Sequence, residues 1–246
     1  MKLTVLGYYG GYPWNNVGTS SYLIQSGGYN LLLDCGSEAL LTLEKVLDPL
    51  QLDAVLLSHY HHDHTADVGV LQYYWQLKNG SKKEAVLPIY GHTQDPLNFG
   101  ALTWPNSTVG KAYSEDQTLD LGPFELTFMK TQHPVPAFAI KLVEKVSQKV
   151  LVFTSDTAYF SGLVSFAQNA DMLMTDTNFY ADKTGKKWHM TSAESGDLAK
   201  LAHSKRLLLT HLPQEGSLDT LVQEAQTSAG TSVQVERAHK LRTYQI

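Results

Sequence analysis

SHYHHDHTAD, the stretch Ser58–Asp67, places four of the chain's ten histidines and two aspartates within ten consecutive positions. Imidazole and carboxylate groups are metal ligands, and a mixture of the two suits Zn²⁺, with Mn²⁺ or Fe²⁺ as alternatives. His59 and His61 are two residues apart at a strand end, so their side chains point the same way and can grip one ion. If the chain then turns into a helix, Asp63 and His64 lie in its first turn and face a second ion. The spacing therefore predicts an open site for two metal ions.

Short apolar runs on both sides of this stretch have the composition of buried strands. They lie at residues 2–7, 20–26, 29–34, 52–58, 85–90, 124–130, 138–144, 149–155, 170–175 and 206–210. Apolar spacing of three and four predicts helices over 37–47, 68–78 and 217–225. The sequence TSAE, Thr191–Glu194, predicts a capping box that opens a helix running to about His203. Early hairpins and later strands alternating with helices predict an α/β protein with two packed sheets and helices outside.

Composition limits the kinds of protein that fit. The 246 residues are 43% hydrophobic, and no internal repeat or linker marks a boundary, so we expect a single domain over 1–246. A net charge of −5 without a basic run argues against a nucleic-acid partner and favours a small-molecule substrate. The single Cys35 excludes an internal disulfide and a thiolate zinc site. No signal peptide or long apolar stretch is present, so we expect a cytoplasmic protein without a membrane partner.

Five apolar runs each end on an ionisable residue, at the strand end where open α/β sheets place their ligand crevice. These residues are His59, His133, Asp156, Asp176 and His211. Taken alone, Asp156 also fits a helix cap, and His133 and His211 also fit surface positions. Together with the histidine cluster they supply the ligands that a two-metal hydrolase needs. We therefore expect the five to converge.

The remaining polar residues near these runs have plainer interpretations. Asp34, directly after a buried strand, is expected to support the metal-binding loop from below. His62 is expected to be a bystander within its cluster. His92, His203 and His239 are interpreted as ordinary histidines.

The motif HYHHDH, followed in order by His133, Asp156 and His211, resembles the metallo-β-lactamase superfamily over nearly the whole chain. Within that superfamily, WHMTSAESGDLAKLA followed by RLLLTHLP resembles the ribonuclease Z branch, in which a His-x-Thr segment opens the helix before the last metal-ligand strand. The resemblance implies an α/β fold, the four-layer αββα sandwich, with the site between the sheets. It also implies two metal ions, usually zinc, and a homodimer.

The resemblance further implies a role for each site residue. The expected ligands are His59, His61 and His133 for the first ion, Asp63, His64 and His211 for the second, and Asp156 as a bridge. Asp63 would also orient the attacking water or accept its proton, and His189 would stabilise the oxyanion or protonate the leaving alkoxide. Asp176 stands where the family commonly has Glu and is the expected partner of His189. The alternative for His189 is a histidine at a helix entry that solvent satisfies.

One departure from ribonuclease Z bears on the substrate. In that branch a long arm that grips tRNA is inserted between the third histidine and the bridging aspartate. Here only enough chain for a short hairpin separates His133 from Asp156. This favours the smaller phosphodiesterases of the branch, including cyclic phosphodiesterases, over a tRNA 3′-processing endonuclease.

Other activities share the same ligands and stay open as alternatives. A lactonase or thioesterase could use the same two metal ions. A di-iron electron carrier is less favoured, because such members usually have Glu where this chain has His61. The primary prediction is a dinuclear metal-dependent phosphodiesterase.

Overall fold

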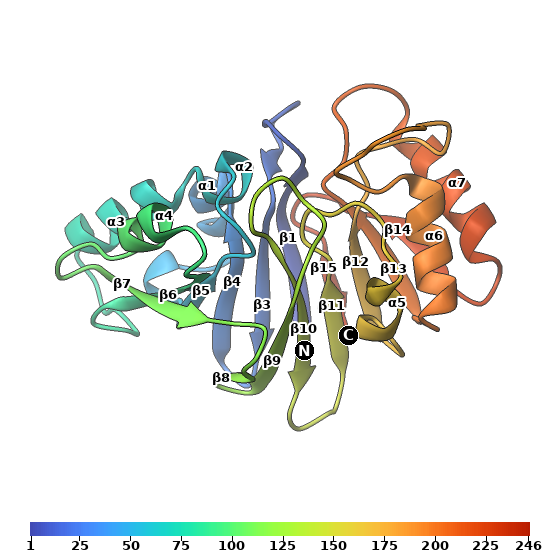
Figure 1. Ribbon diagram of the computed structural model, residues 1–246. Coiled ribbons are helices and arrows are strands. Elements are labelled where there is room, and N and C mark those ends of the chain that lie inside the picture. The colour runs from blue at the N-terminus through green and yellow to red at the C-terminus, as the bar shows by residue number, and fades with distance from the viewer. The chain divides into compact units, whose positions relative to one another are not determined.

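Two β-sheets organise the chain, and the computed structural model describes all residues from Met1 to Ile246 (Figure 1). The sheets belong to two units of chain. Unit 1 comprises Met1–Gln117, Leu121–Pro123 and His239–Gln245, and unit 2 comprises Thr118–Asp120, Phe124–Ala238 and Ile246. That the chain forms a single domain stays a prediction.

The sheet of unit 1 has eight strands. They are β1 (Lys2–Tyr9), β2 (Gly18–Thr19), β3 (Ser21–Ser26), β4 (Tyr29–Cys35), β5 (Ala54–Leu56), β6 (Leu87–His92), β7 (Thr108–Tyr113) and β15 (Thr243–Gln245). Their order is β15-β1-β3-β4-β5-β6-β7, with β2 beside β1. β1, β3 and β4 pair antiparallel, whereas β4 to β7 run parallel. The carboxyl ends of β4 and β5 therefore lie at the same edge, where Asp34 and the histidine motif are found.

Short helices connect these strands. They are α1 (Ala39–Leu43), the 3₁₀ helix η1 (Pro49–Gln51), α2 (His62–Thr65), α3 (Val68–Leu77) and α4 (Pro96–Ala101). α3 buries Leu71 and Trp75 in the hydrophobic core of the unit, which explains its apolar spacing. The helix predicted over 68–78 is confirmed, and the one predicted over 37–47 is shorter than expected.

The sheet of unit 2 has seven strands. They are β8 (Leu119–Leu121), β9 (Phe124–Lys130), β10 (Phe138–Glu144), β11 (Val150–Phe153), β12 (Met172–Asp176), β13 (Arg206–Thr210) and β14 (Gln234–Arg237). β9, β10 and β11 pair antiparallel, and β11 to β14 run parallel in that order. β12 and β13 are almost fully buried, as continuous apolar runs in a parallel sheet should be.

The helices of unit 2 are α5 (Gly162–Phe166), α6 (Ser192–Leu201) and α7 (Leu218–Ala229). The predicted capping box is confirmed, since the Thr191 side chain accepts from the Glu194 backbone N–H and the Glu194 side chain accepts from that of Thr191. α6 and α7 pack side by side (Figure 1). A Cβ at Gly196 would lie 2.2 Å from the Ala225 carbonyl oxygen, so this helix contact requires glycine. None of the helices combines the length and hydrophobicity needed to cross a bilayer.

All ten predicted strands are present, and five further strands were not expected. One of the five is β2, a two-residue strand beside β1. The other four, β7, β8, β14 and β15, are the outer strands of the two sheets. Each has exposed or half-buried positions, so none forms a continuous apolar run. An edge strand has a neighbour on one side only and can carry polar residues, which removes the signal that a buried strand leaves in the sequence.

Candidate metal centre

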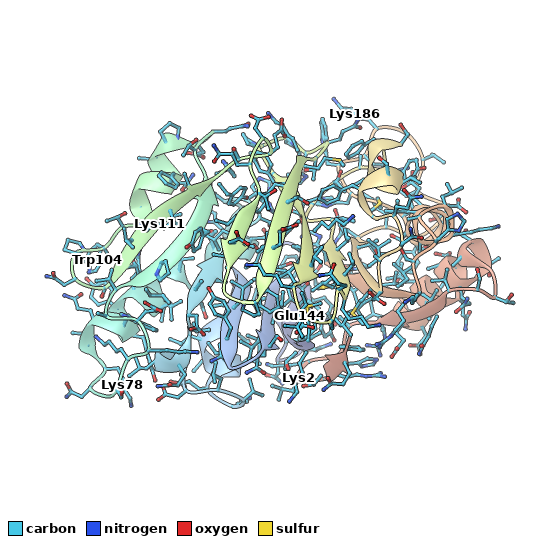
Figure 2. The ribbon with its side chains drawn as sticks, turned by 90° about the horizontal axis from the view of Figure 1, so that it is seen from below. Lys2, Lys78, Trp104, Lys111, Glu144 and Lys186 are labelled. Atoms are coloured by element: carbon cyan, nitrogen blue, oxygen red, sulfur yellow. The ribbon has the colours of Figure 1, made fainter.

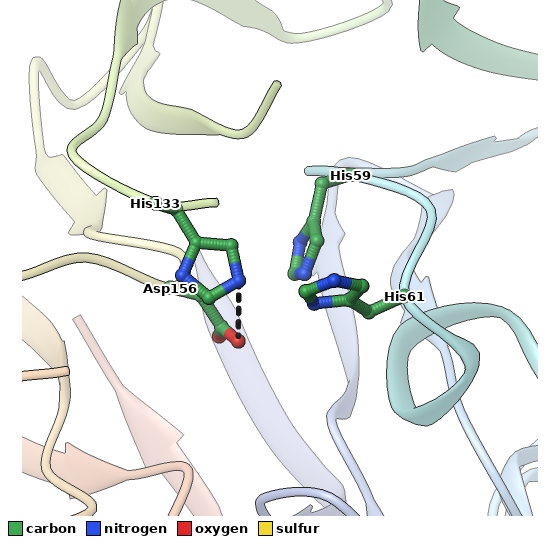
Figure 3. A group of neighbouring side chains, drawn as sticks. All are labelled: His59, His61, His133 and Asp156. Carbon is green, nitrogen blue, oxygen red and sulfur yellow. Dashed lines mark ion pairs between the residues drawn. The ribbon is translucent and has the colours of Figure 1, made fainter. Parts of the chain in front are cut away.

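In unit 1 the histidine motif begins just beyond β5 and runs into α2. His59 is fully buried, His61 is the N-cap of α2, and Asp63 and His64 lie in the helix's first turn. The chain therefore turns into a helix directly after His61, which is the condition under which the sequence predicted that Asp63 and His64 lie together. The ring centroids of His59 and His61, both drawn in Figure 3, are 4.9 Å apart. The ring centroids of His59 and His64 are 4.1 Å apart. Unit 1 thus gathers the predicted ligands of the motif, while His62 is exposed as a bystander should be.

Asp34 supports the motif from the end of β4. Its fully buried carboxylate accepts hydrogen bonds from the Ser58 N–H at 2.8 Å, the Ser58 hydroxyl at 2.9 Å and His64 Nδ1 at 2.7 Å. Because the Ser58 hydroxyl hydrogen goes to Asp34, its oxygen can accept from His59 Nδ1 at 3.1 Å. Both histidines are thereby fixed as the tautomer whose Nε2 can bind a metal ion. The supporting role predicted for Asp34 is confirmed.

The loop after β1 contacts the motif within unit 1. The Gly11 N–H donates to Asp63 Oδ2 at 2.7 Å, and the same oxygen lies 3.6 Å from His64 Nε2. Gly11 has φ 74°, a conformation that favours glycine. Nothing in the sequence identified this loop as the partner of Asp63.

In unit 2 four residues form a cluster of potential metal ligands, with all ligand atoms within 4.8 Å of one another: Asp156, Asp176, His189 and His211. They come from the carboxyl ends of β11, β12 and β13 and from the approach to α6. His211 Nε2 lies 3.3 Å from Asp156 Oδ2, and His211 Nδ1 lies 3.2 Å from Asp176 Oδ1. Three of the five strand-end residues that were expected to converge, Asp156, Asp176 and His211, therefore lie together within this unit.

His133 lies next to this cluster and contacts two of its members, Asp156 and His189. Its Nε2 lies 3.8 Å from Asp156 Oδ2, the contact dashed in Figure 3. Its Nδ1 donates to the backbone carbonyl of Trp188 at 3.2 Å, so Nε2 is the nitrogen that can bind a metal ion. Sequence analysis missed this role of Trp188, because a backbone carbonyl leaves no signal in the residue type.

His189 forms a short hydrogen bond with Asp176. His189 Nδ1 donates to Asp176 Oδ2 at 2.7 Å, and that oxygen also accepts from the Thr157 N–H at 3.0 Å. Burial alone would lower the pKa of His189, but the charge and hydrogen bond of Asp176 outweigh it, so the pKa is raised above its ordinary value. The two residues are the pair that the sequence predicted, and the His189 side chain stays 21% exposed while that of Asp176 is buried.

The donor sets fit divalent metal ions. Each unit offers imidazoles and carboxylates, the groups that zinc and related ions bind. His59, His64 and His133 each use Nδ1 for a hydrogen bond, which orients Nε2 as the ligand atom. The chain therefore carries histidine and aspartate clusters able to hold metal.

Comparisons with known proteins agree with this chemistry. The model of the β-lactamase superfamily domain matches residues 29–212, which include every candidate site residue. The probable metallo-hydrolase YhfI of Bacillus subtilis (strain 168) is 46% identical over 240 residues, covering 97% of this chain and 98% of its own. The crystal structure of YhfI, a metallo-β-lactamase fold protein, superposes with a TM-score of 0.93 at 45% identity, covering 99% and 98% of the two chains. The short form of human tRNase Z shares the fold, with a TM-score of 0.76 at 22% identity over 100% and 99% of the two chains.

Proposed function

From the premise that the chain belongs to the metallo-β-lactamase superfamily and is a metallo-hydrolase of that fold, we propose that it hydrolyses small phosphodiesters or cyclic phosphates. The hydrogen-bonded pair of His189 and Asp176 is the observation that carries the proposal. A histidine whose pKa is raised can deliver a proton. The leaving alkoxide of a phosphodiester needs that proton.

We propose that two divalent ions bind, Zn²⁺ by preference, with Mn²⁺ or Fe²⁺ as alternatives. One tetrahedral zinc ion uses at most four protein ligands, and the proposed set exceeds that number. The set is His59, His61, Asp63, His64, His133, Asp156 and His211. When bound, the ions supply Lewis acidity that activates water and stabilises charge on the phosphoryl oxygens.

The residues around these ligands hold the proton-transfer groups in place. The Gly11 N–H restrains the Asp63 carboxylate, which orients the attacking water or accepts its proton. Asp176 holds the His189 ring and favours its charged form, and His189 transfers the proton to the leaving oxygen.

A panel of chromogenic substrates tests the reaction class. We expect the Zn²⁺- or Mn²⁺-loaded protein to hydrolyse a nitrophenyl phosphodiester faster than a lactone or a thioester. Hydrolysis of the lactone or thioester without phosphodiester turnover would instead support the lactonase or thioesterase alternative, which uses the same ligands.

Metal analysis tests the dinuclear site. After loading and removal of excess metal, we expect about two ions per chain, fewer in Asp63→Ala, and weaker binding of both ions in Asp156→Ala. One ion per chain, unchanged by Asp63→Ala, would show that the site is mononuclear.

A further inference from the structure

The segment between β12 and α6 places lysines against aromatic rings. Three lysines stand in the five positions 183–187. Lys183 Nζ lies 5.2 Å from the Phe179 ring centroid, and Lys186 Nζ lies 4.5 Å from that of Trp188 (Lys186 is labelled in Figure 2). Both distances allow a cation–π attraction. We call Phe179–Trp188 the lysine–aromatic loop.

This loop adjoins the histidines of the unit 2 cluster. The Phe179 and His189 ring centroids are 5.8 Å apart, and the Trp188 carbonyl accepts from His133 Nδ1. Trp188 also directly precedes His189 in the chain. Phe179 therefore contacts His189 through its ring, and Trp188 contacts His133 through its backbone carbonyl.

The Trp188 side chain is partly open to solvent. It is 39% exposed, although burying an indole is favourable. Lys186 holds a positive charge beside it. Proteins bind nucleotides with partly exposed aromatic rings that have a cation nearby, because a base stacks on the ring and the cation attracts the phosphate.

We propose that Trp188 and Lys186 form a subsite for the base of a nucleoside-type phosphodiester whose phosphate lies at the unit 2 cluster, an inference that rests on the proposed function. The ligand is of single-nucleotide size. Three lysines in a chain of net charge −5 do not make the basic stripe that a polynucleotide needs. Because the base would stack on Trp188, the subsite selects diesters that carry a base over simple alkyl diesters.

Two probes with one leaving group isolate the base. Thymidine 5′-(4-nitrophenyl phosphate) carries a base and methyl 4-nitrophenyl phosphate does not, so chemistry at the leaving group is matched. We expect Trp188→Ala to raise KM for the thymidine probe by roughly 5- to 150-fold relative to the methyl probe, the equivalent of one lost base–aromatic stack. Trp188→Leu, which keeps apolar volume, should behave like Trp188→Ala, and Trp188→Phe should retain most of the preference.

Trp104 offers a matched control. This residue, labelled in Figure 2, is similarly exposed, at 36%, but lies in unit 1, where its Nε1 donates to Gln76. Trp104→Ala should leave the ratio of the two KM values unchanged. An equal ratio in wild type, Trp188→Ala and Trp188→Leu would overturn the inference.

A binding measurement separates this inference from the proposed function. Calorimetry with thymidine 5′-monophosphate should show weaker binding to metal-loaded Trp188→Leu than to wild type. If the wild-type protein hydrolyses neither probe, the proposed phosphodiesterase activity is refuted. The calorimetric titration then still tests whether Trp188 binds the base. Hydrolysis of both probes with equal KM and unchanged nucleotide binding in Trp188→Leu would refute the subsite alone.

Discussion

Two buried aspartates do the same work in the two units. Asp34 accepts from His64 Nδ1 and Asp176 accepts from His189 Nδ1, each at 2.7 Å. Such a bond fixes the tautomer and orientation of the ring. The consequences differ, because we propose His64 as a metal ligand and His189 as a proton donor.

Removing the charge of Asp34 should weaken metal binding. In Asp34→Asn we expect affinity for Zn²⁺ to fall about 10- to 100-fold, because His64 and Ser58 lose the group that positions them. Competition with a chromophoric chelator measures this. Asp67→Asn is the control, since Asp67 accepts from the Leu40 N–H in the same unit. If Asp34→Asn binds Zn²⁺ with wild-type affinity, Asp34 is not needed to position the metal-binding histidine.

His189→Ala should lose turnover and keep metal. For a substrate with a poor leaving group we expect kcat to fall roughly 10²- to 10⁴-fold, the range for loss of a positioned general acid. The loss should shrink for nitrophenolate, which needs little protonation, and Asp176→Asn should show the same dependence more weakly. Release of a metal ion would identify His189 as a ligand. An unchanged kcat for both leaving groups would make it the solvent-satisfied histidine at a helix entry.

Among the elements, α6 and α7 differ in how they begin. Thr191 caps α6 in a full capping box, whereas Ser217 at the start of α7 makes no side-chain cap hydrogen bond. We expect Thr191→Ala to lower the free energy of unfolding by about 1 kcal/mol and Ser217→Ala by a few tenths. Urea denaturation compares them, and equal losses would show that the capping box contributes nothing specific.

Asp171 links the beginnings of three strands of unit 2. It accepts from Lys149 Nζ and Lys205 Nζ, each at 2.8 Å, and from the Val150 N–H at 2.9 Å. Burial raises the pKa of Asp171, but these hydrogen bonds outweigh it and lower the pKa to about 2. Because the folded pKa lies below the unfolded value, the stabilisation is complete above the unfolded pKa and is lost as pH falls toward the folded one.

Acid denaturation tests this contribution. Asp171→Asn should lower the free energy of unfolding at neutral pH by about 1 kcal/mol, a modest amount because both lysines are partly exposed. Relative to wild type, the difference should shrink between about pH 4 and pH 2. A difference independent of pH would mean that the carboxylate charge is not responsible.

For the molecule as a whole, the negative net charge and the short segment between His133 and Asp156 favour a small substrate over a large nucleic acid. The net charge is −5, and β10 and β11 form only a short hairpin between His133 and Asp156. We expect turnover of small phosphodiesters and little cleavage of precursor tRNA, measured with the same metal-loaded protein. Efficient tRNA cleavage that weakens steeply with added salt would contradict this.

Two properties of the whole molecule stay predictions. Analytical ultracentrifugation at several protein concentrations tests the homodimer that the resemblance to ribonuclease Z implies. Cell fractionation tests the predicted cytoplasmic location.

The sequence alone determined the buried strands, the capped helix and the types of metal ligand. These depend on local physics: apolar runs predict covered strands, and a Thr three residues before Glu predicts a cap. The HYHHDH motif also identified the superfamily, which the match over residues 29–212 confirms, and with it the metallo-β-lactamase fold. The assignment of seven ligands stays a prediction.

Which of these groups meet depends on the folded structure. Asp34 and His64 are 30 residues apart, and Asp176 and His189 are 13 apart, so their hydrogen bonds depend on where strands and loops end in space. The outer strands were missed because a strand with one neighbour needs no continuous apolar run. The contact of Trp188 with His133 was missed because its backbone carbonyl accepts the hydrogen bond, and a carbonyl 55 residues away leaves no signal in the sequence.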